Sequence, residues 1–240
     1  MVKAALEAST HIRDNDIKKI ERKSSDFDLV SNLDIEVEDI IRERLKRFKK
    51  NIIGEERVYE KEKDSFIIDP IDGTLNFING NPLWGINIAY MENYEIVKGL
   101  IFLPMLNEFY FAVKGKGVYL NGERILKGKT EGERPIIVNL FNSKLVNERV
   151  EIRNLGASSV ELSWLVNKRY RGVITGRAKI WDVAPALLFC SELDIGVYQS
   201  NMESARYVFG EINDYRYLRD TFKDSLNKIS RPSIVDKGSI

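Results

Sequence analysis

The stretch SFIIDPIDGTLN (residues 65–76) places an apolar run, two carboxylates and a predicted helix start close together in the chain. Residues 66–68 are a short apolar run, which is typical of a buried strand. Pro70 prevents the simple continuation of that strand, because proline has no N–H for the ladder. We therefore expect Asp69 to lie at the carboxyl end of the strand.

Two acids three positions apart, Asp69 and Asp72, repel each other unless a cation or protons intervene. Carboxylate oxygens are the ligands that hard metal ions prefer. Gly73 permits a tight turn, and Thr74 is a favoured cap for a following helix, whose N-terminus attracts an anion such as phosphate. The alternative is a plain turn in which Asp72 bonds the backbone, and this spacing alone leaves both interpretations open.

The composition indicates a globular protein. The 240 residues, 43% of them hydrophobic, can build a sizeable core in one large domain or two coupled halves. Lys plus Arg (37) balances Asp plus Glu (36), and the net charge of +1 argues against nucleic-acid or anionic-membrane binding. No stretch approaches the roughly 20 apolar residues of a membrane span, so we expect a cytoplasmic location. Cys190, the single cysteine, is expected to be a buried thiol, and His11 a solvent-facing residue.

Residues 31–50 are predicted to form a helix, because apolar side chains recur at helical spacing with acids early and bases late. Asp34 lies in its first turn, and a strand-like segment then leads to Glu55. Apolar segments separated by turn residues predict an antiparallel meander over 85–91, 95–103, 108–113 and 117–120. A polar connection at 127–133 divides the chain into an N-terminal α+β half (1–130) and a C-terminal α/β half (131–240).

The second half alternates strand-like and helical segments, which predicts a parallel or mixed sheet. The expected strands are 135–141, 152–155, 171–175 and 195–199, and the expected helices are 158–168, 182–193 and 213–230. The tail after Arg231 is expected to be poorly ordered. Taken alone, Asp182 ahead of Pro185 fits a helix N-cap, and Glu55 alone fits a loop acid.

Together the acidic segments occur in the order GEE (54–56), DPIDGT (69–74) and WD (181–182). This order resembles the inositol monophosphatase family of metal-dependent sugar phosphatases. Three further segments resemble the same family: DLVSNLD (28–34), GLIFLPMLNEFYFAVKGKGVYLNGERI (99–125) and RNLGASSVEL (153–162). The resemblance covers roughly residues 23–190 and implies an α+β fold, a layered α-β-α-β-α sandwich.

The resemblance also implies two or three Mg²⁺ ions. Glu55, Asp69 and the carbonyl of Ile71 would hold one ion, and Asp69, Asp72 and Asp182 would hold a second. Two hard cations can clamp a phosphate ester and stabilise both the attacking and the leaving oxygen of an in-line displacement. Ligation by acids alone fits magnesium and argues against zinc.

Catalytic and substrate-binding roles are implied in the same way. The hydroxyl of Thr74, paired with Asp34, would orient and deprotonate the attacking water, and Glu55 is the other candidate base. The backbone amides of Gly73 and Thr74, next to Asp72, would receive phosphate oxygens. The substrate's hydroxyls would meet a second helix start formed by Gly156, Ala157 and Ser158.

The chain departs from the family pattern in two places. Thr175 stands where the family has an acid that contacts inositol, and the segment after Leu193 is unlike the family. Four bases lie around Thr175: Arg169, Arg171, Arg177 and Lys179. They are either ordinary surface charge or partners for a second phosphate, and Arg177 is the candidate substrate-binding residue among them.

The leading hypothesis is a magnesium-dependent, lithium-sensitive phosphomonoesterase that acts on inositol 1-phosphate, fructose 1,6-bisphosphate or both. One alternative is a 3′(2′),5′-bisphosphate nucleotidase, in which Trp84 or Trp164 would stack on adenine, although both fit core patterns better. Another is a non-catalytic regulatory protein on the same fold. The expected partners are a small-molecule phosphate ester and, as is common in the family, a second copy of the chain in a homodimer.

Overall fold

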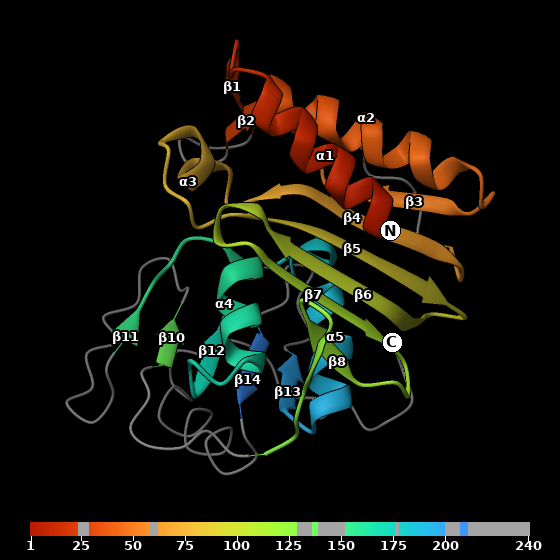
Figure 1. Cartoon of the computed structure of the whole chain (residues 1–240), viewed down its shortest axis with the longest axis vertical. Coiled ribbons are helices and arrows are strands. Elements are labelled where there is room, and N and C mark those ends of the chain that lie inside the picture. The colour runs from red at the N-terminus through yellow and green to blue at the C-terminus, as the bar shows by residue number, and fades with distance from the viewer. Residues whose placement is uncertain are drawn as a thin grey trace.

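The computed structural model describes residues 1–23, 29–57, 62–128, 136–138, 152–175, 178–199 and 207–210. Within these ranges the elements stack as helices, a large sheet, helices and a smaller sheet (Figure 1). This order confirms the α+β sandwich. The predicted helix at 213–230 and the tail after Arg231 lie outside the described residues.

The first layer consists of α1 (Val2–Asp14) and α2 (Asn32–Lys46), which pack side by side on the large sheet (Figure 1). Between them in sequence, β1 (Ile20–Arg22) and β2 (Leu29–Ser31) form an antiparallel pair. Helix α2 buries an apolar stripe at helical spacing, formed by Leu33, Val37, Ile41 and Leu45. The expectation for His11 was wrong in part, because its ring is half-buried and lies 2.7 Å from Glu36 of α2.

The large sheet contains seven strands in the order β3-β4-β5-β6-β7-β8-β9. Their bounds are β3 (Asn51–Gly54), β4 (Ser65–Asp72), β5 (Gly85–Glu92), β6 (Glu95–Leu103), β7 (Glu108–Val113), β8 (Val118–Leu120) and β9 (Glu123–Ile125). The run from β4 to β9 is antiparallel, which confirms the meander, and β3 pairs with β4 in parallel. Short helices α3 (Thr74–Ile78) and η1 (Pro104–Leu106) follow β4 and β6.

Strand β4 does not end at Asp69, so that prediction was wrong. The strand continues through Pro70 to Asp72, with a register shift between the two acids. The parallel ladder with β3 has already ended at Ile68, so the missing N–H of Pro70 costs no hydrogen bond to β3. The irregularity brings both acids to the end of one strand.

The C-terminal half forms a five-stranded mixed sheet in the order β11-β10-β12-β14-β13. The strands are β10 (Ile136–Val138), β11 (Ile152–Arg153), β12 (Gly172–Ile174), β13 (Gly196–Gln199) and β14 (Tyr207–Gly210). The alternation prediction is confirmed, although β14 was not foreseen. Helices α4 (Ser158–Val166) and α5 (Ile180–Leu193) lie between the two sheets.

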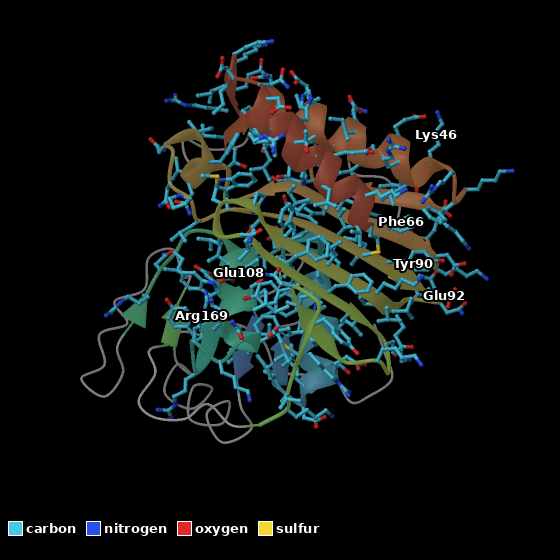
Figure 2. All side chains as sticks on the ribbon, viewed as in Figure 1. Lys46, Phe66, Tyr90, Glu92, Glu108 and Arg169 are labelled. Carbon is cyan, nitrogen blue, oxygen red and sulfur yellow. The ribbon has the colours of Figure 1, made fainter. Side chains whose placement is uncertain are left out.

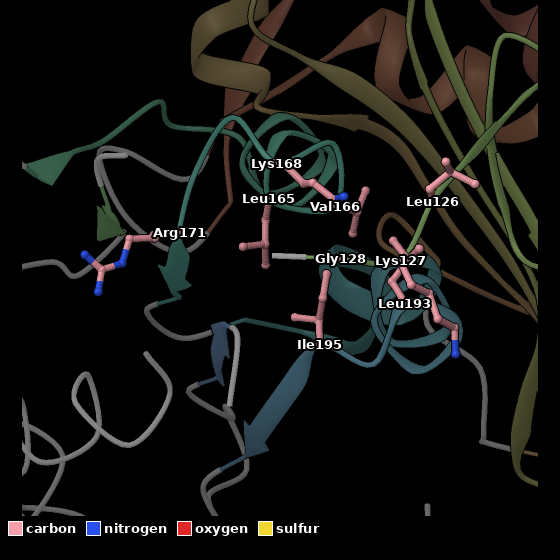
Figure 3. Close-up of a pocket in the computed structure, with 9 residues that line it drawn as sticks. All are labelled: Leu126, Lys127, Gly128, Leu165, Val166, Lys168, Arg171, Leu193 and Ile195. Carbon is pink, nitrogen blue, oxygen red and sulfur yellow. The ribbon is translucent and has the colours of Figure 1, made fainter. Parts of the chain in front are cut away.

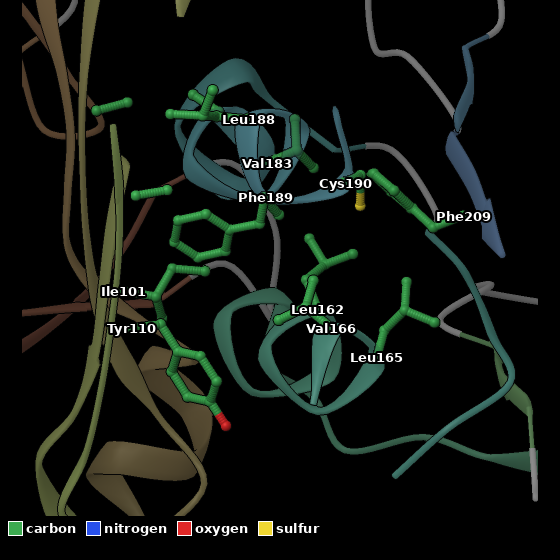
Figure 4. Packing of buried hydrophobic residues seen from close by; sticks show 14 of the residues in the cluster. Ile101, Tyr110, Leu162, Leu165, Val166, Val183, Leu188, Phe189, Cys190 and Phe209 are labelled. Atoms are coloured by element: carbon green, nitrogen blue, oxygen red, sulfur yellow. The ribbon is translucent and has the colours of Figure 1, made fainter. Parts of the chain in front are cut away.

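A continuous core joins the two sheets through α4 and α5. Figure 4 shows Ile101 and Tyr110 of the large sheet facing Phe189 of α5 and Leu162 of α4, with Phe209 of the small sheet beyond them. Cys190 is buried in this cluster as a free thiol, as expected. No helix in the described ranges is long and apolar enough to cross a membrane. The division of the chain at residue 130 stays a prediction.

Candidate active site

Two carboxylates of β4 and one from the distant helix α5 meet at the end of β4. Asp69, Asp72 and Asp182 each offer an oxygen within 4.8 Å of the others. Side chains alternate along β4, so Phe66 and Ile68 pack against α1 and α2, whereas Ile67 and then Asp69 face α4 and α5. The strand thus directs Asp69 toward the start of α5, where Asp182 lies.

Two helix starts hold the other two acids. The backbone N–H of Ser159 in α4 donates to Asp72 at 2.5 Å. Asp182 is not an N-cap: α5 begins at Ile180, and the Asp182 carboxylate accepts the N–H of Lys179 at 2.7 Å. Both bonds use backbone donors that a helix leaves unpaired in its first turn.

A proline explains the contact between α5 and the large sheet. Pro185 lies inside α5 and has no N–H, so the carbonyl of Trp181, four residues earlier, has no helical donor. The side-chain amide of Asn87 donates to that carbonyl at 3.3 Å. Asn87 is fully buried and lies directly opposite Asp69 in the β4–β5 register. It therefore fixes the first turn of α5, and Asp182 with it, beside Asp69.

The group is short of positive charge. Burial raises the pKa of Asp69 well above its usual range, and the charges of Glu55, Asp72 and Asp182 raise it further. Burial likewise raises the pKa of Asp72 to about 6, although hydrogen bonds from Ser159 oppose that shift. The pKa of Asp182 is raised well above its usual value by burial and by the charge of Asp72.

Glu55 adjoins this group from the turn after β3. Lys23 donates to its carboxylate at 2.9 Å and also pairs with Glu56. Burial alone would lower the pKa of Lys23, but the two carboxylates raise it above the ordinary value. Burial raises the pKa of Glu56 to about 7. The turn thus carries two acids that share one ammonium group.

Asp34 and Thr74 are joined as expected. The Thr74 hydroxyl lies 3.1 Å from Asp34 Oδ1 and 3.0 Å from the carbonyl oxygen of Ile71. Asp34 is fully buried and accepts the N–H and hydroxyl of Ser31 at 2.8 and 2.6 Å, so it also caps α2. Burial raises the pKa of Asp34.

Thr74 was predicted to cap α3, and this prediction was wrong, because Thr74 is the first residue of the helix. The cap is Gly73, whose φ of 87° is a left-handed conformation that glycine adopts without strain. A Cβ on Gly73 would lie 2.7 Å from the Cβ of Ala157, so the loop of Gly156, Ala157 and Ser158 touches this turn. Asn76 secures the contact by donating to the carbonyl of Leu155 at 2.7 Å.

Two of the four predicted bases lie away from the acids. Arg169 lies beside Glu108 (Figure 2) and donates to it at 2.6 Å. The guanidinium of Arg169 also stacks over Trp164. Arg171 lines a small cavity at the C-terminal ends of α4 and α5 (Figure 3). Arg177 lies outside the described residues. Thr175 is buried, and its hydroxyl accepts the N–H of Tyr207 in β14 at 3.0 Å.

The acids suit a hard cation. Asp69 is 1% exposed, and its Oδ1 has no hydrogen-bond partner in the described part of the chain. The ligand atoms that these three aspartates offer are all carboxylate oxygens, which matches the ligand preference of Mg²⁺ and Ca²⁺. Such an ion would satisfy the orphaned oxygen and offset the repulsion that raises the three pKa values.

Protonation should therefore stabilise the metal-free protein. An acid whose pKa is higher in the folded state than in the unfolded state binds its proton more tightly when folded, so stability is lost as the pH rises through the folded pKa. For Asp72 this window runs from 3.8 to about 6. In EDTA, we expect the melting temperature to rise by roughly 5 °C as the pH is lowered from about 7 to about 5. Thermal unfolding followed by circular dichroism measures this, and a flat or opposite trend contradicts it. Magnesium should reverse the trend.

The sequence did not reveal Ser159, Asn87 or Lys23 as members of the site. Ser159 acts through its backbone, which any residue could supply. Asn87 lies within an apolar strand, and a polar residue at a buried strand position was the available signal. Lys23 stood among many charged residues and had no distinguishing pattern.

Comparisons with known proteins identify the family of the chain. A sequence profile described as the inositol monophosphatase family matches residues 1–208. A fructose-1,6-bisphosphatase/inositol-1-monophosphatase of Thermotoga maritima is 32% identical over 217 residues, covering 82% of this chain and 84% of that protein. A fructose-1,6-bisphosphatase of Pyrococcus furiosus is 31% identical over 181 residues, covering 72% and 70%.

The solved structure of an inositol monophosphatase from Thermotoga maritima matches with a TM-score of 0.85 at 26% identity, covering 95% of this chain and 96% of that one. The fold, the acidic group and the profile point to the same class of protein. The chain belongs to the inositol monophosphatase family and is a phosphoric monoester hydrolase.

Proposed function

We propose that this chain is a magnesium-dependent phosphatase of sugar or polyol phosphates, acting on inositol 1-phosphate, fructose 1,6-bisphosphate or both. The observation that carries the proposal is the buried group of Asp69, Asp72 and Asp182, with one oxygen of each within 4.8 Å of the others. Relatives named for both activities support the substrate class.

The proposed metal ligands are those that the family resemblance implies. Asp69, Asp72 and Asp182 would hold one Mg²⁺, and Glu55, Asp69 and the carbonyl of Ile71 would hold another, with two or three ions in all. When bound, the ions supply Lewis-acid stabilisation of the phosphate oxygens and lower the pKa of water. The backbone amides of Gly73 and Thr74 would orient the phosphate.

Thr74 would orient the attacking water, and Asp34 would take up its proton. When the Thr74 hydroxyl donates to Asp34, its own lone pairs can accept a hydrogen bond from water. Burial raises the pKa of Asp34 above its ordinary value, which is the direction that suits a general base, and Glu55 is the second candidate.

The packing of two tryptophans favours a sugar over a nucleotide. Trp84 is 4% exposed and packs edge-on against Phe77, and Trp164 stacks on Tyr170, so neither ring is placed to receive an adenine. Lys179 is exposed at the start of α5, next to Asp182, and could meet the second phosphate of a bisphosphate. Gly156, Ala157, Ser158 and Arg177 complete the proposed substrate contacts.

Phosphate release across a substrate panel tests the proposal. We expect hydrolysis of inositol 1-phosphate or fructose 1,6-bisphosphate that EDTA abolishes, Mg²⁺ restores and Li⁺ inhibits, because the acids need a bound cation to accept a phosphate dianion. Full activity without divalent metal would sink the mechanism. Hydrolysis of adenosine 3′,5′-bisphosphate alone would favour the nucleotidase instead. The cytoplasmic location and the homodimer stay predictions, and light scattering measures the latter.

A further inference from the structure

A buried ion pair on α2 forms hydrogen bonds with the backbone of the turn that carries Glu55. Arg42 donates through Nε to Glu38 at 2.7 Å, one helical turn earlier. The Glu38 side chain is 1% exposed and that of Arg42 is 15% exposed. Burying two charges costs about as much free energy as their attraction returns, so stability alone is a weak reason for such a pair.

The pair bonds the backbone on both sides of Glu55. Arg42 Nη1 donates to the carbonyl of Ile52 at 3.0 Å, and Nη2 donates to the carbonyl of Arg57 at 2.7 Å. The second oxygen of Glu38 accepts the N–H of Glu56 at 2.8 Å. Three backbone groups that bracket Glu55 are thus fixed by two side chains of one helix.

Gly54 makes this approach possible. A Cβ at Gly54 would lie 2.7 Å from both Arg42 Nη2 and Glu38 Oε2. Only a residue without a side chain lets the turn lie against the pair. Gly54 is therefore required for the close contact between the turn and the ion pair of Glu38 and Arg42.

The same face of α2 also reaches the other wall of the site. Asp34, Glu38 and Arg42 recur every four residues, so they lie along one side of the helix. Asp34 bonds Thr74 after β4, whereas Glu38 and Arg42 bond the turn after β3. One helix face therefore sets the distance between the two segments that bear the acids.

We propose that Glu38 and Arg42 are positioning residues that hold Glu55 in place for metal binding, an inference that rests on the proposed function. Neither side chain is assigned to the metal, and both act through the backbone of the Glu55 turn. Mutation of residues that orient a metal ligand typically lowers metal affinity by about 10- to 100-fold. Loss of the hydrogen bonds from this ion pair to the Glu55 turn should therefore weaken Mg²⁺ binding by that factor.

Titration calorimetry with Mg²⁺ alone, on the metal-free full-length chain, tests this inference. We expect Arg42→Met to raise the metal dissociation constant by about 10- to 100-fold. The kcat at saturating Mg²⁺ should stay close to the wild-type value, because the catalytic groups are intact. Gly54→Ala, which keeps both charges but displaces the turn, should act in the same direction. Arg44→Met is the matched control, because Arg44 lies on the same helix and pairs with Glu7 of α1 instead.

The outcomes separate the two proposals. If wild-type protein binds no Mg²⁺, the proposed function itself fails. If wild-type protein binds Mg²⁺ and the Arg42 and Gly54 variants bind it equally well, the positioning role is overturned. If Arg42→Met does not fold, Gly54→Ala decides: a raised dissociation constant supports the role, and an unchanged one refutes it.

Discussion

Replacing Asp69 by asparagine is expected to abolish phosphatase activity and, at the same time, to stabilise the metal-free protein. Asp69 is buried, and within the described ranges one of its oxygens has no hydrogen-bond partner. Burial, together with three neighbouring carboxylates, raises its pKa. An amide of the same shape removes one negative charge and gives the group a donor. We expect a gain in the free energy of unfolding of about 1 kcal/mol, or a melting temperature higher by roughly 2–4 °C.

The loss of activity should be far larger than the change in stability. Metal-ion catalysis supplies several kcal/mol, and each ~1.4 kcal/mol is a factor of ten, so kcat should fall by about 10³-fold or more. Thermal unfolding in EDTA and phosphate release in Mg²⁺ measure the two effects separately. Asp194→Asn is the control, because Asp194 ends α5, is exposed and pairs with Lys127. An active Asp69→Asn enzyme would refute the role of this acid.

The order of strands and helices was predictable because it depends on local sequence patterns of apolar and polar residues. The meander showed as apolar runs between turn residues, and α2 showed as a stripe of apolar residues with acids early and bases late. Errors arose where a neighbour decides the conformation. Pro70 is tolerated within β4 because the ladder with β3 ends at Ile68 and the register with β5 shifts between Asp69 and Asp72. Strand β14 was missed because its apolar run lay among polar residues without a clear turn signal.

The acids of the site were found through their order along the chain, but their supports were not. Periodicity cannot show that Glu38 and Arg42 turn inward, because a pair four residues apart on a helix is usually a solvated surface pair. Asn87 is explained only by the carbonyl that Pro185 leaves free on a helix far away in sequence. Such contacts depend on the packed arrangement of distant elements, which a single sequence does not display.

Thr74→Val is the second substitution with a large expected effect. Valine keeps the shape but removes the hydroxyl that links Asp34 to the end of β4. Proton transfer through a positioned group contributes about 10²- to 10⁴-fold, so we expect kcat to fall by at least 10²-fold. One lost hydrogen bond costs about 1 kcal/mol, so the protein should stay folded.

The paired variant Thr74→Ser separates the hydroxyl from the methyl group. Serine retains the donor and should keep most of the activity, whereas the Mg²⁺ dissociation constant should be similar in both variants because neither removes a carboxylate. Thr10→Val is the control, since the hydroxyl of Thr10 donates to the carbonyl of Leu6 on the exposed side of α1. If Thr74→Val retains wild-type kcat, the proton path through Asp34 is wrong, and Glu55 is then the remaining candidate base.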